Sequence, residues 1–229
     1  MSKIKLITID IDGTLLSSGQ QVPKENIQAI RQAVNQGIKI VIASGRPLSG
    51  ILPWLKIIGV PKADDQFVIA FNGGVIQTTS GKLIAKNAID YNGYKTLQNF
   101  ADKQNAYFQV ESLDGSHTIS RLIPKEAQME NYLINSALQI HDQMPEKVEF
   151  IKPMINGSQQ ELDRLISIVP KKNRKKISMS SEGPGITWNL CPKRLLKAAL
   201  SQSSSIIWES QVTQQWRSET KVTIYQCLK

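Results

Sequence analysis

The sequence predicts an α/β protein with a parallel-sheet core and a smaller inserted α+β module. Three observations support this fold class. Over the first 80 residues short apolar runs alternate with an amphipathic segment, as in a doubly wound sheet. A polar motif follows each apolar run, at the end of the strand where such sheets bind their ligands. From about Gly81 the pattern changes to helices mixed with alternating strands, which indicates an insertion.

The amino-terminal elements follow from apolar spacing. Residues 4–9 form an apolar run that predicts the first strand. Residues 23–36 predict a helix, because Pro23 suits a first turn, apolar residues recur at helical spacing and a glycine follows. Residues 38–43 and 67–71 are continuous apolar runs, as expected for strands buried on both faces.

The inserted module is predicted to contain both kinds of element. Its predicted helices cover residues 91–105, 124–138 and 158–169. Its predicted strands cover residues 82–88, 107–111, 118–121, 148–155, 176–180 and 186–190. We therefore expect the amino-terminal part of the core at residues 1–80, the α+β module at residues 81–187, and a residual core segment with an aberrant tail at residues 188–229.

Two carboxylates follow the first strand. Asp10 and Asp12 are one residue apart, so strand geometry places them on one face. Two like charges this close repel each other unless a cation or a proton lies between them. The pattern fits a site in which one carboxylate is a nucleophile on phosphorus, the second is a general acid/base, and Mg²⁺ is the counter-ion. A helix cap or an Asx turn after an edge strand is the alternative interpretation, and it fits a lone Asp-x-Asp better than the full string through Gly13 and Thr14.

Composition limits the class of protein. The chain has 229 residues, 41% hydrophobic and 21% charged, which is typical of a soluble globular protein. No apolar run is long enough to span a membrane, and the first residues predict a strand and no signal peptide. The two cysteines, Cys191 and Cys227, form neither a disulfide framework nor a metal-ligand set, so we expect a cytoplasmic location.

The net charge of +9 raises the possibility of nucleic-acid binding. Its densest contribution, residues 171–176, has no aromatic residues among its lysines and arginine. A solvated loop between a helix and a strand is the better interpretation of this run. We therefore expect no nucleic-acid partner.

Two further motifs complete the pattern in the core. Ser44-Gly45-Arg46-Pro47 follows the second apolar run, and Asn72-Gly73 follows the third. With Asp10-x-Asp12-Gly13-Thr14 first in this order, the chain resembles the haloacid dehalogenase (HAD) superfamily, and more narrowly the Cof-type sugar-phosphate phosphatases. The resemblance covers roughly residues 1–193. It implies a HAD-like Rossmannoid core with an inserted α+β cap.

The resemblance also implies roles for the residues in these motifs. Asp10 would be the nucleophile that becomes aspartyl-phosphate, and Asp12 would protonate the leaving alcohol and then activate water. Mg²⁺ would bind the Asp10 carboxylate and the Asp12 backbone carbonyl. Ser44 and the Gly45 amide would hold the phosphoryl oxygens.

Three of these positions have structural alternatives. Ser44 could instead cap the next helix. Asn72 could orient the substrate or only stabilise its own turn. Arg46 fits a structural ion pair or a cap better than a phosphate ligand.

The chain departs from the family pattern after the cap. The family has a lysine in a Lys-Gly pair and a Gly-Asp-x-x-Asn-Asp motif whose carboxylate completes the Mg²⁺ site. Here a Ser/Gln-rich tail follows Lys193, and no aspartate occurs after Asp163. Lys197 stands where the family lysine belongs. We therefore expect an incomplete core at the carboxyl end and impaired activity.

The genetic code suggests an explanation for the tail. When the third base of each codon is read with the first two bases of the next, Trp208-Glu209 must encode glycine. Residues 215–229 can then encode M-A-I-G-D-E-S-N-D-I-S-M-F-E, which contains the missing motif. A single-base slip near Lys193-Arg194 would account for both missing elements. We interpret the tail as the product of a frameshift.

The predicted function is Mg²⁺-dependent hydrolysis of small phosphate monoesters, with a small phosphorylated metabolite, such as a sugar phosphate, as the partner. A catalytically inactive remnant of such an enzyme is the first alternative. A phosphomutase or phosphotransferase on the same fold, and a basic nucleic-acid-binding protein, are the others.

Overall fold

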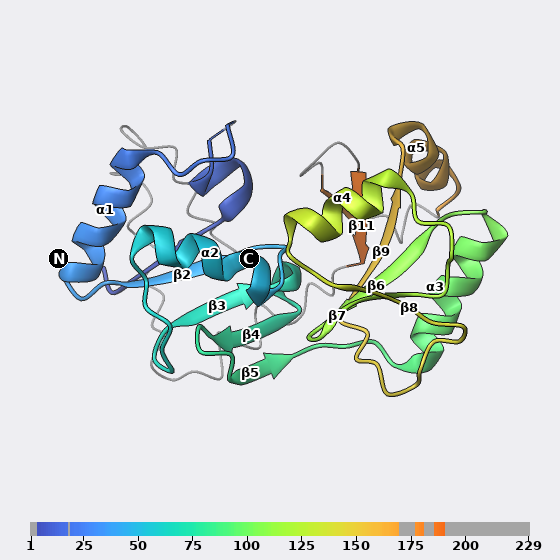
Figure 1. Ribbon diagram of the computed structural model, residues 1–229, viewed down its shortest axis with the longest axis horizontal. Coiled ribbons are helices and arrows are strands. Elements are labelled where there is room, and N and C mark those ends of the chain that lie inside the picture. Colours follow the sequence, from blue (N-terminus) through green and yellow to red (C-terminus); the bar gives the residue numbers. More distant parts are fainter. Residues whose placement is uncertain (1–3, 18, 170–176, 181–185, 191–229) are drawn as a thin grey trace. The chain divides into compact units, whose positions relative to one another are not determined.

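The computed structural model describes residues 4–17, 19–169, 177–180 and 186–190, which form two compact units. The first unit extends to Ala85 and the second begins at Lys86. Each unit is built on its own β-sheet with associated helices (Figure 1). The predicted α/β fold class is therefore confirmed. Within the described part of the chain, no helix has the length and apolar character needed to cross a membrane.

The first unit is a five-stranded sheet with the order β1-β2-β3-β4-β5. β1–β2 and β2–β3 pair in parallel, and β4 pairs antiparallel with β3. The strands are β1 (Leu6–Ile9), β2 (Lys39–Ala43), β3 (Phe67–Ala70), β4 (Val75–Thr78) and β5 (Leu83–Lys86). The helices are α1 (Lys24–Asn35) and α2 (Leu48–Ile58).

The sequence patterns explain most of this unit. Ile40, Val41 and Ile42 of β2 are at most 5% exposed, as expected for a strand that is covered on both faces. The predicted helix over residues 23–36 is α1. Strand β4 was not predicted, because its residues are neither a long apolar run nor a clear alternation. It forms because Phe71 and Asn72 adopt left-handed backbone angles (φ 52° and 54°) and reverse the chain after β3.

The second unit is a six-stranded sheet with the order β10-β11-β9-β6-β7-β8. The pairings β10–β11, β11–β9, β9–β6 and β6–β7 are antiparallel, and β7–β8 is parallel. The strands are β6 (Phe108–Ser112), β7 (Gly115–Thr118), β8 (Leu138–Ile140), β9 (Lys152–Gly157), β10 (Ile177–Ser180) and β11 (Ile186–Leu190). The helices are α3 (Tyr91–Lys103), α4 (Lys125–Leu133) and α5 (Gln159–Ile168).

Three predicted elements of this unit were placed wrongly. The strand predicted at residues 118–121 is β7, which ends at Thr118. The helix predicted at residues 124–138 ends at Leu133, because Asn135 takes a left-handed conformation (φ 52°) and the chain continues into β8. The strand predicted at residues 148–155 is shifted and forms β9. For β7 and β9 the boundary is determined by sheet pairing, which apolar periodicity does not report.

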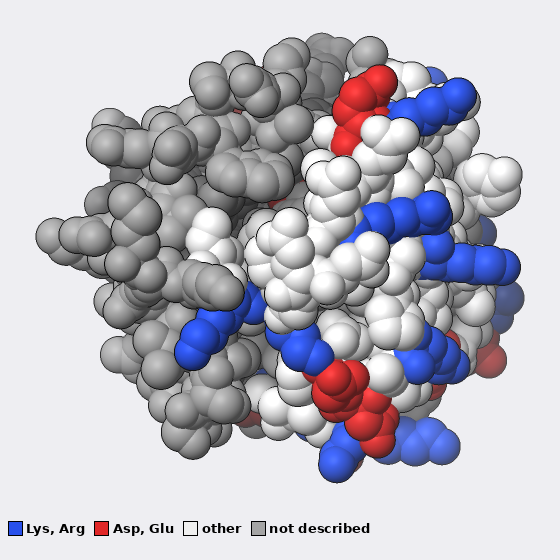
Figure 2. All heavy atoms as spheres, turned by 90° about the vertical axis from the view of Figure 1, so that its left-hand side faces the viewer, with Lys and Arg blue, Asp and Glu red and all other residues white. Residues whose placement is uncertain are grey.

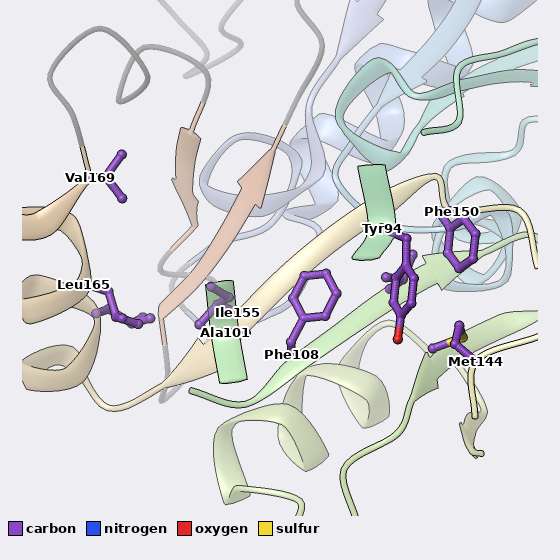
Figure 3. Packing of buried hydrophobic residues seen from close by; sticks show 10 residues of the cluster. Tyr94, Ala101, Phe108, Met144, Phe150, Ile155, Leu165 and Val169 are labelled. Atoms are coloured by element: carbon purple, nitrogen blue, oxygen red, sulfur yellow. The ribbon is translucent and has the colours of Figure 1, made fainter. Parts of the chain in front are cut away.

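One face of the second sheet carries an apolar core (Figure 3). Tyr94 of α3 stacks on Phe150, with ring centres 4.7 Å apart. Phe108 of β6 lies beside Tyr94, at 6.0 Å between ring centres. Leu162 and Leu165 of α5 are at most 1% exposed in the same cluster. α3 and α5 therefore cover this face through aromatic and branched side chains.

The opposite face of the same strands is polar. Alternation along β6 directs Gln109 and Glu111 away from the apolar core. Glu111 is paired with Lys152 of β9, with Nζ 3.3 Å from Oε2, and the side chains are 1% and 4% exposed. Gln109 accepts a hydrogen bond from Asn131 of α4 at 3.1 Å. Burial raises the pKa of Glu111 to about 7, although the Lys152 charge acts in the opposite direction.

The buried glutamate predicts a dependence of stability on pH. Its pKa is higher in the folded chain than its ordinary value of 4.5. The folded state therefore binds this proton more tightly than the unfolded state, and the resulting stabilisation is lost as the pH rises from about 4.5 through 7. In the Glu111→Gln variant this loss should be absent. The difference in unfolding free energy between the two proteins should change by about 1–3 kcal/mol between about pH 5 and pH 8. Urea denaturation across this range measures the difference, and parallel curves would contradict the prediction.

Candidate active site

The loop after β1 places two carboxylates at the end of the strand. Asp10 is extended (φ −81°, ψ 152°) and directly precedes a tight turn, Ile11–Leu15. The Leu15 amide donates to the Asp10 carbonyl at 3.0 Å, and Gly13 has a positive φ of 74° that favours glycine. Ile11 and Leu15 are at most 1% exposed and anchor the turn. Burial of these two side chains thus fixes the loop that carries both aspartates.

Arg46 binds Asp12 through two contacts. Its Nε lies 2.9 Å from Asp12 Oδ2, and its Nη2 lies 2.6 Å from Asp12 Oδ1. Both side chains are only 6% exposed. A bidentate guanidinium–carboxylate pair is among the strongest side-chain contacts and fixes direction as well as distance. The pair therefore connects the loop after β1 to the loop after β2.

Backbone hydrogen bonds connect the loops after β2 and β3. The Ser44 amide donates to the Ile69 carbonyl at 2.9 Å, and the Asn72 amide donates to the Ser44 carbonyl at 3.1 Å. The Phe71 amide donates to the Arg46 carbonyl at 3.2 Å. The predicted site residues Asp12, Ser44 and Asn72 thus lie on three loops at one edge of the sheet, which direct contacts hold together.

Gly45 lies against the side chain of Asn72. A Cβ atom at position 45 would be 2.8 Å from Asn72 Oδ1, closer than real Cβ contacts come. Asn72 is exposed and left-handed (φ 54°, ψ 35°), a conformation that asparagine tolerates better than most residues. Only glycine fits at position 45 without displacing this amide.

Ser44 does not cap the following helix. The N-terminal cap position of α2 is Pro47, and no side chain caps it. The Ser44 hydroxyl oxygen instead accepts a hydrogen bond from the Arg46 amide at 3.2 Å. Its own proton is not used in this bond and can be donated to a ligand. The helix-cap alternative for Ser44 is therefore wrong, and the ion-pair interpretation of Arg46 is confirmed.

The Asp10 carboxyl group is in an environment that disfavours negative charge. Burial is the main cause, and the neighbouring Asp12 charge adds to it. The backbone hydrogen bond at Ile11 and the Arg46 charge act in the opposite direction, and the net effect raises the pKa of Asp10 to about 6. A bound cation would relieve this cost, because it compensates the charge directly.

The donor chemistry at Asp10 and Asp12 suits Mg²⁺, which prefers carboxylate and carbonyl oxygens. The Asp12 carboxylate is bound by Arg46, so its backbone carbonyl is the more suitable donor. The described residues contain no group of three acidic, histidine or cysteine side chains that could hold a metal. The predicted Lys197 lies outside the residues that the structure describes.

The chain matches the family model for haloacid dehalogenase-like hydrolases over residues 7–203. A protein of Streptococcus pyogenes serotype M6, provisionally named a phosphatase, is 32% identical over 172 residues, which are 73% of this chain and 63% of the relative. Phosphatase YwpJ of Bacillus subtilis is 36% identical over 107 residues, 47% of this chain and 36% of the relative. The chain thus spans less than two thirds of the length of these relatives.

Solved structures share the fold. A haloacid dehalogenase-like hydrolase from Bacteroides thetaiotaomicron superposes with a TM-score of 0.67 at 24% identity, over 87% of this chain and 77% of the other. One from B. subtilis superposes with a TM-score of 0.65 at 22% identity, over 87% and 79% of the two chains. At these sequence identities, the similarity to the two solved structures shows a shared fold.

The contact between Gly45 and Asn72 can be tested by a double-mutant cycle. Gly45→Ala should lower the unfolding free energy by about 1 kcal/mol or less, because the amide that the new methyl group overlaps is the end of an exposed side chain and can move. In an Asn72→Gly background, which removes Oδ1 and keeps the left-handed turn accessible, the same substitution should cost much less. Urea midpoints of the four proteins give the coupling energy. Additive effects would show that the contact does not constrain position 45.

Proposed function

This chain belongs to the haloacid dehalogenase-like hydrolases, and from that premise we propose that it is a Mg²⁺-dependent phosphatase of small phosphate monoesters. The observation that carries the proposal is the convergence of three loops at the carboxyl edge of the first sheet. The Asp12–Arg46 pair and the backbone hydrogen bonds of Ser44 and Asn72 hold these loops together. Such an edge is where open α/β sheets bind their ligands.

Asp10 is the proposed nucleophile. An Asp10 carboxylate oxygen would form a bond to phosphorus as the bond from phosphorus to the substrate oxygen breaks. Water would then attack the phosphorus of the aspartyl-phosphate and release inorganic phosphate. The Ser44 hydroxyl and the Gly45 amide would donate hydrogen bonds to the phosphoryl oxygens and stabilise the charge that develops on them. Mg²⁺, bound by the Asp10 carboxylate and the Asp12 backbone carbonyl, would offset negative charge on both reacting groups.

Asp12 is the proposed general acid and base. It would give a proton to the leaving oxygen and later take one from the attacking water. Both Asp12 oxygens contact Arg46 in this structure. One of these contacts has to open for Asp12 to reach the substrate. Arg46 can retain the other contact and so keep the carboxylate oriented.

The proposed substrates are sugar phosphates and related polyol phosphates. A B. subtilis relative, the 5-amino-6-(5-phospho-D-ribitylamino)uracil phosphatase YwtE, is 34% identical over 111 residues, which are 48% of this chain and 37% of the relative. Its named substrate carries a phosphate on a ribityl chain. We propose that the inserted module at residues 81–187 acts as the cap that selects among such substrates.

The tail after Lys193 affects the phosphatase activity that we expect of this chain. We propose that the sequence after Lys193 results from a frameshift, because the shifted frame can encode the complete acidic motif of the family. Without that motif the chain lacks the carboxylate that would complete a Mg²⁺ site, and Lys197 would take the place of the family lysine only by coincidence. With its present carboxyl-terminal sequence, this chain should therefore be a weak phosphatase or an inactive remnant of one.

A basic nucleic-acid-binding protein is a weaker candidate. In Figure 2 the described lysines and arginines on the face shown are spread among uncharged and acidic side chains. The run at residues 171–176 lies outside the described residues. A phosphomutase or phosphotransferase would use Asp10 and Asp12 in the same way, and product analysis with an added acceptor alcohol separates these activities from hydrolysis.

Restoring the reading frame tests the account of the tail. Sequencing of the gene should show codons from residue 194 onward that permit the shifted motif. The protein from a gene with one base inserted or removed near codon 193 should hydrolyse p-nitrophenyl phosphate with Mg²⁺ at ordinary enzymatic rates, whereas the present chain should be weak or inactive. Codons that forbid the motif, or full activity of the present chain, would end this proposal.

The role of Asp10 is tested in the more active of these two proteins. Asp10→Asn should lower kcat by at least about 10³-fold, because the amide is a poor nucleophile. Asp65→Asn is the matched control, since Asp65 is 70% exposed and pairs with Lys39 on the surface. The control should retain nearly full activity. Equal activity of the two variants would rule out Asp10 as the nucleophile.

A further inference from the structure

The chain has two histidines, and the fold brings them into direct contact. His117 lies in β7 and is 1% exposed, and His141 follows β8 directly. His117 Nδ1 is 3.0 Å from His141 Nε2. Residues 24 positions apart in the sequence therefore share one nitrogen–nitrogen hydrogen bond in the second unit. No step of the proposed phosphatase reaction uses them.

The ring geometry defines this contact. The two imidazole planes differ by 12°, and the ring centres are 5.3 Å apart. This separation is close to the nitrogen–nitrogen distance plus the radius of each ring, so the two nitrogens lie on the line between the centres. The rings meet edge to edge in one plane, with the two lone-pair directions opposed. Two imidazoles bound to one metal ion would need lone pairs that converge beside this line, so the geometry is that of an N–H···N hydrogen bond.

Asp114 sets the direction of the hydrogen bond. Its Oδ1 is 3.0 Å from His117 Nε2, and the Ser112 hydroxyl also contacts this oxygen. The Ser112 and His117 contacts hold the pKa of Asp114 below its usual range, so the carboxylate accepts. His117 Nε2 must then carry a proton. When His117 is neutral, its Nδ1 carries no proton. It therefore accepts a hydrogen bond from the N–H group at His141 Nε2.

Counting protons shows how many of them this chain of hydrogen bonds can bind. One proton lies between the two rings, one lies on His117 Nε2, and a third can bind His141 Nδ1. A fourth proton would place two N–H groups against each other at 3.0 Å and two positive charges in contact. The paired histidines accordingly take one proton from acid, whereas two separated histidines take two.

We propose that the Asp114–His117–His141 chain is an acid-sensitive latch that holds edge strand β8 to β7 and releases it when both histidines become protonated. The backbone contacts between the strands are few. β8 has three residues, and the His141 amide donates to the Thr118 carbonyl at 2.9 Å. The imidazole contact adds a side-chain link at the end of this short ladder.

The sign of the pH dependence follows from proton counts. Below the ordinary imidazole value of about 6.5, the released state binds one more proton than the latched state. As the pH falls below about 6.5, the ratio of released to latched chains should rise about tenfold per pH unit. Above that value it should change little, so the total rise between pH 7.5 and pH 5 is about 30-fold.

Three other sets of charged groups lie near the latch or on the same strands. Asp114 contacts His117 directly, through Oδ1 and His117 Nε2. Asp142 follows His141 in the chain and is paired with Arg121 on the surface. Glu111 is paired in register with Ser116 on the opposite face of the strands, and its raised pKa makes the unit more stable in acid, opposite in sign to the latch. A local measurement at β8 is therefore needed to observe the latch itself.

Nitrogen NMR of the imidazoles in the full chain tests the proton assignment. At about pH 7.5 both rings should carry their proton on Nε2, and His117 Nδ1 should show a coupling across the hydrogen bond. A proton on His117 Nδ1 with a bare Nε2 would overturn the proposal. This measurement needs no variant.

Hydrogen exchange at the His141 amide tests the release. Its protection factor should fall about 30-fold between pH 7.5 and pH 5 in the unmodified chain. In His141→Gln the side-chain amide can keep the contact with His117 and cannot be protonated, so the fall should be less than about threefold. Asp142→Asn, which changes the adjacent exposed carboxylate, should retain the full pH dependence.

Two outcomes would refute the latch. One is a protection factor at His141 that is the same at both pH values in the unmodified chain. The other is an equal fall in the unmodified chain and in His141→Gln. Phosphatase activity is not part of either readout, so failure of the proposed function and failure of the latch are distinguishable.

Discussion

The buried ion pair between Asp12 and Arg46 is the contact on which the candidate site depends. Both side chains are almost fully buried, and two hydrogen bonds fix their relative orientation. Removing one partner would leave a buried charge without compensation, which typically costs about 3–5 kcal/mol. The pair therefore links the loops after β1 and β2 and also sets the charge balance around Asp10.

The electrostatics of the site follow from this arrangement. Arg46 compensates the Asp12 charge, while Asp10 remains partly buried beside it and keeps a raised pKa. Arg46 pairs directly with Asp12, and the Mg²⁺ that we propose would compensate the charge of Asp10. This asymmetry distinguishes the roles proposed for two residues that look equivalent in the sequence.

The second unit separates its chemistry by sheet face. Phe108 and Phe150 lie in an apolar core with α3 and α5, while Glu111 and Lys152 form a buried pair on the other face. The edge at β7 and β8 carries the histidine contact. Buried polar groups of this kind are costly unless they have partners, so each constrains the fold locally. The Glu111–Lys152 pair and the histidine contact respond to acid in opposite directions. A measurement of global stability alone would therefore not reveal either response.

The sequence by itself determined the α/β class, the strands that precede the three polar loops, and the identity of Asp10, Asp12, Ser44 and Asn72 as residues at strand ends. These features depend on local periodicity and on turn chemistry, which neighbouring residues encode. The tertiary structure alone decided the boundaries of β7, β8 and β9, the partner of Arg46 and the contact between His117 and His141. Pairing partners 24 or 34 residues apart are set by sheet register and loop packing, and neither leaves a periodic signal in the chain.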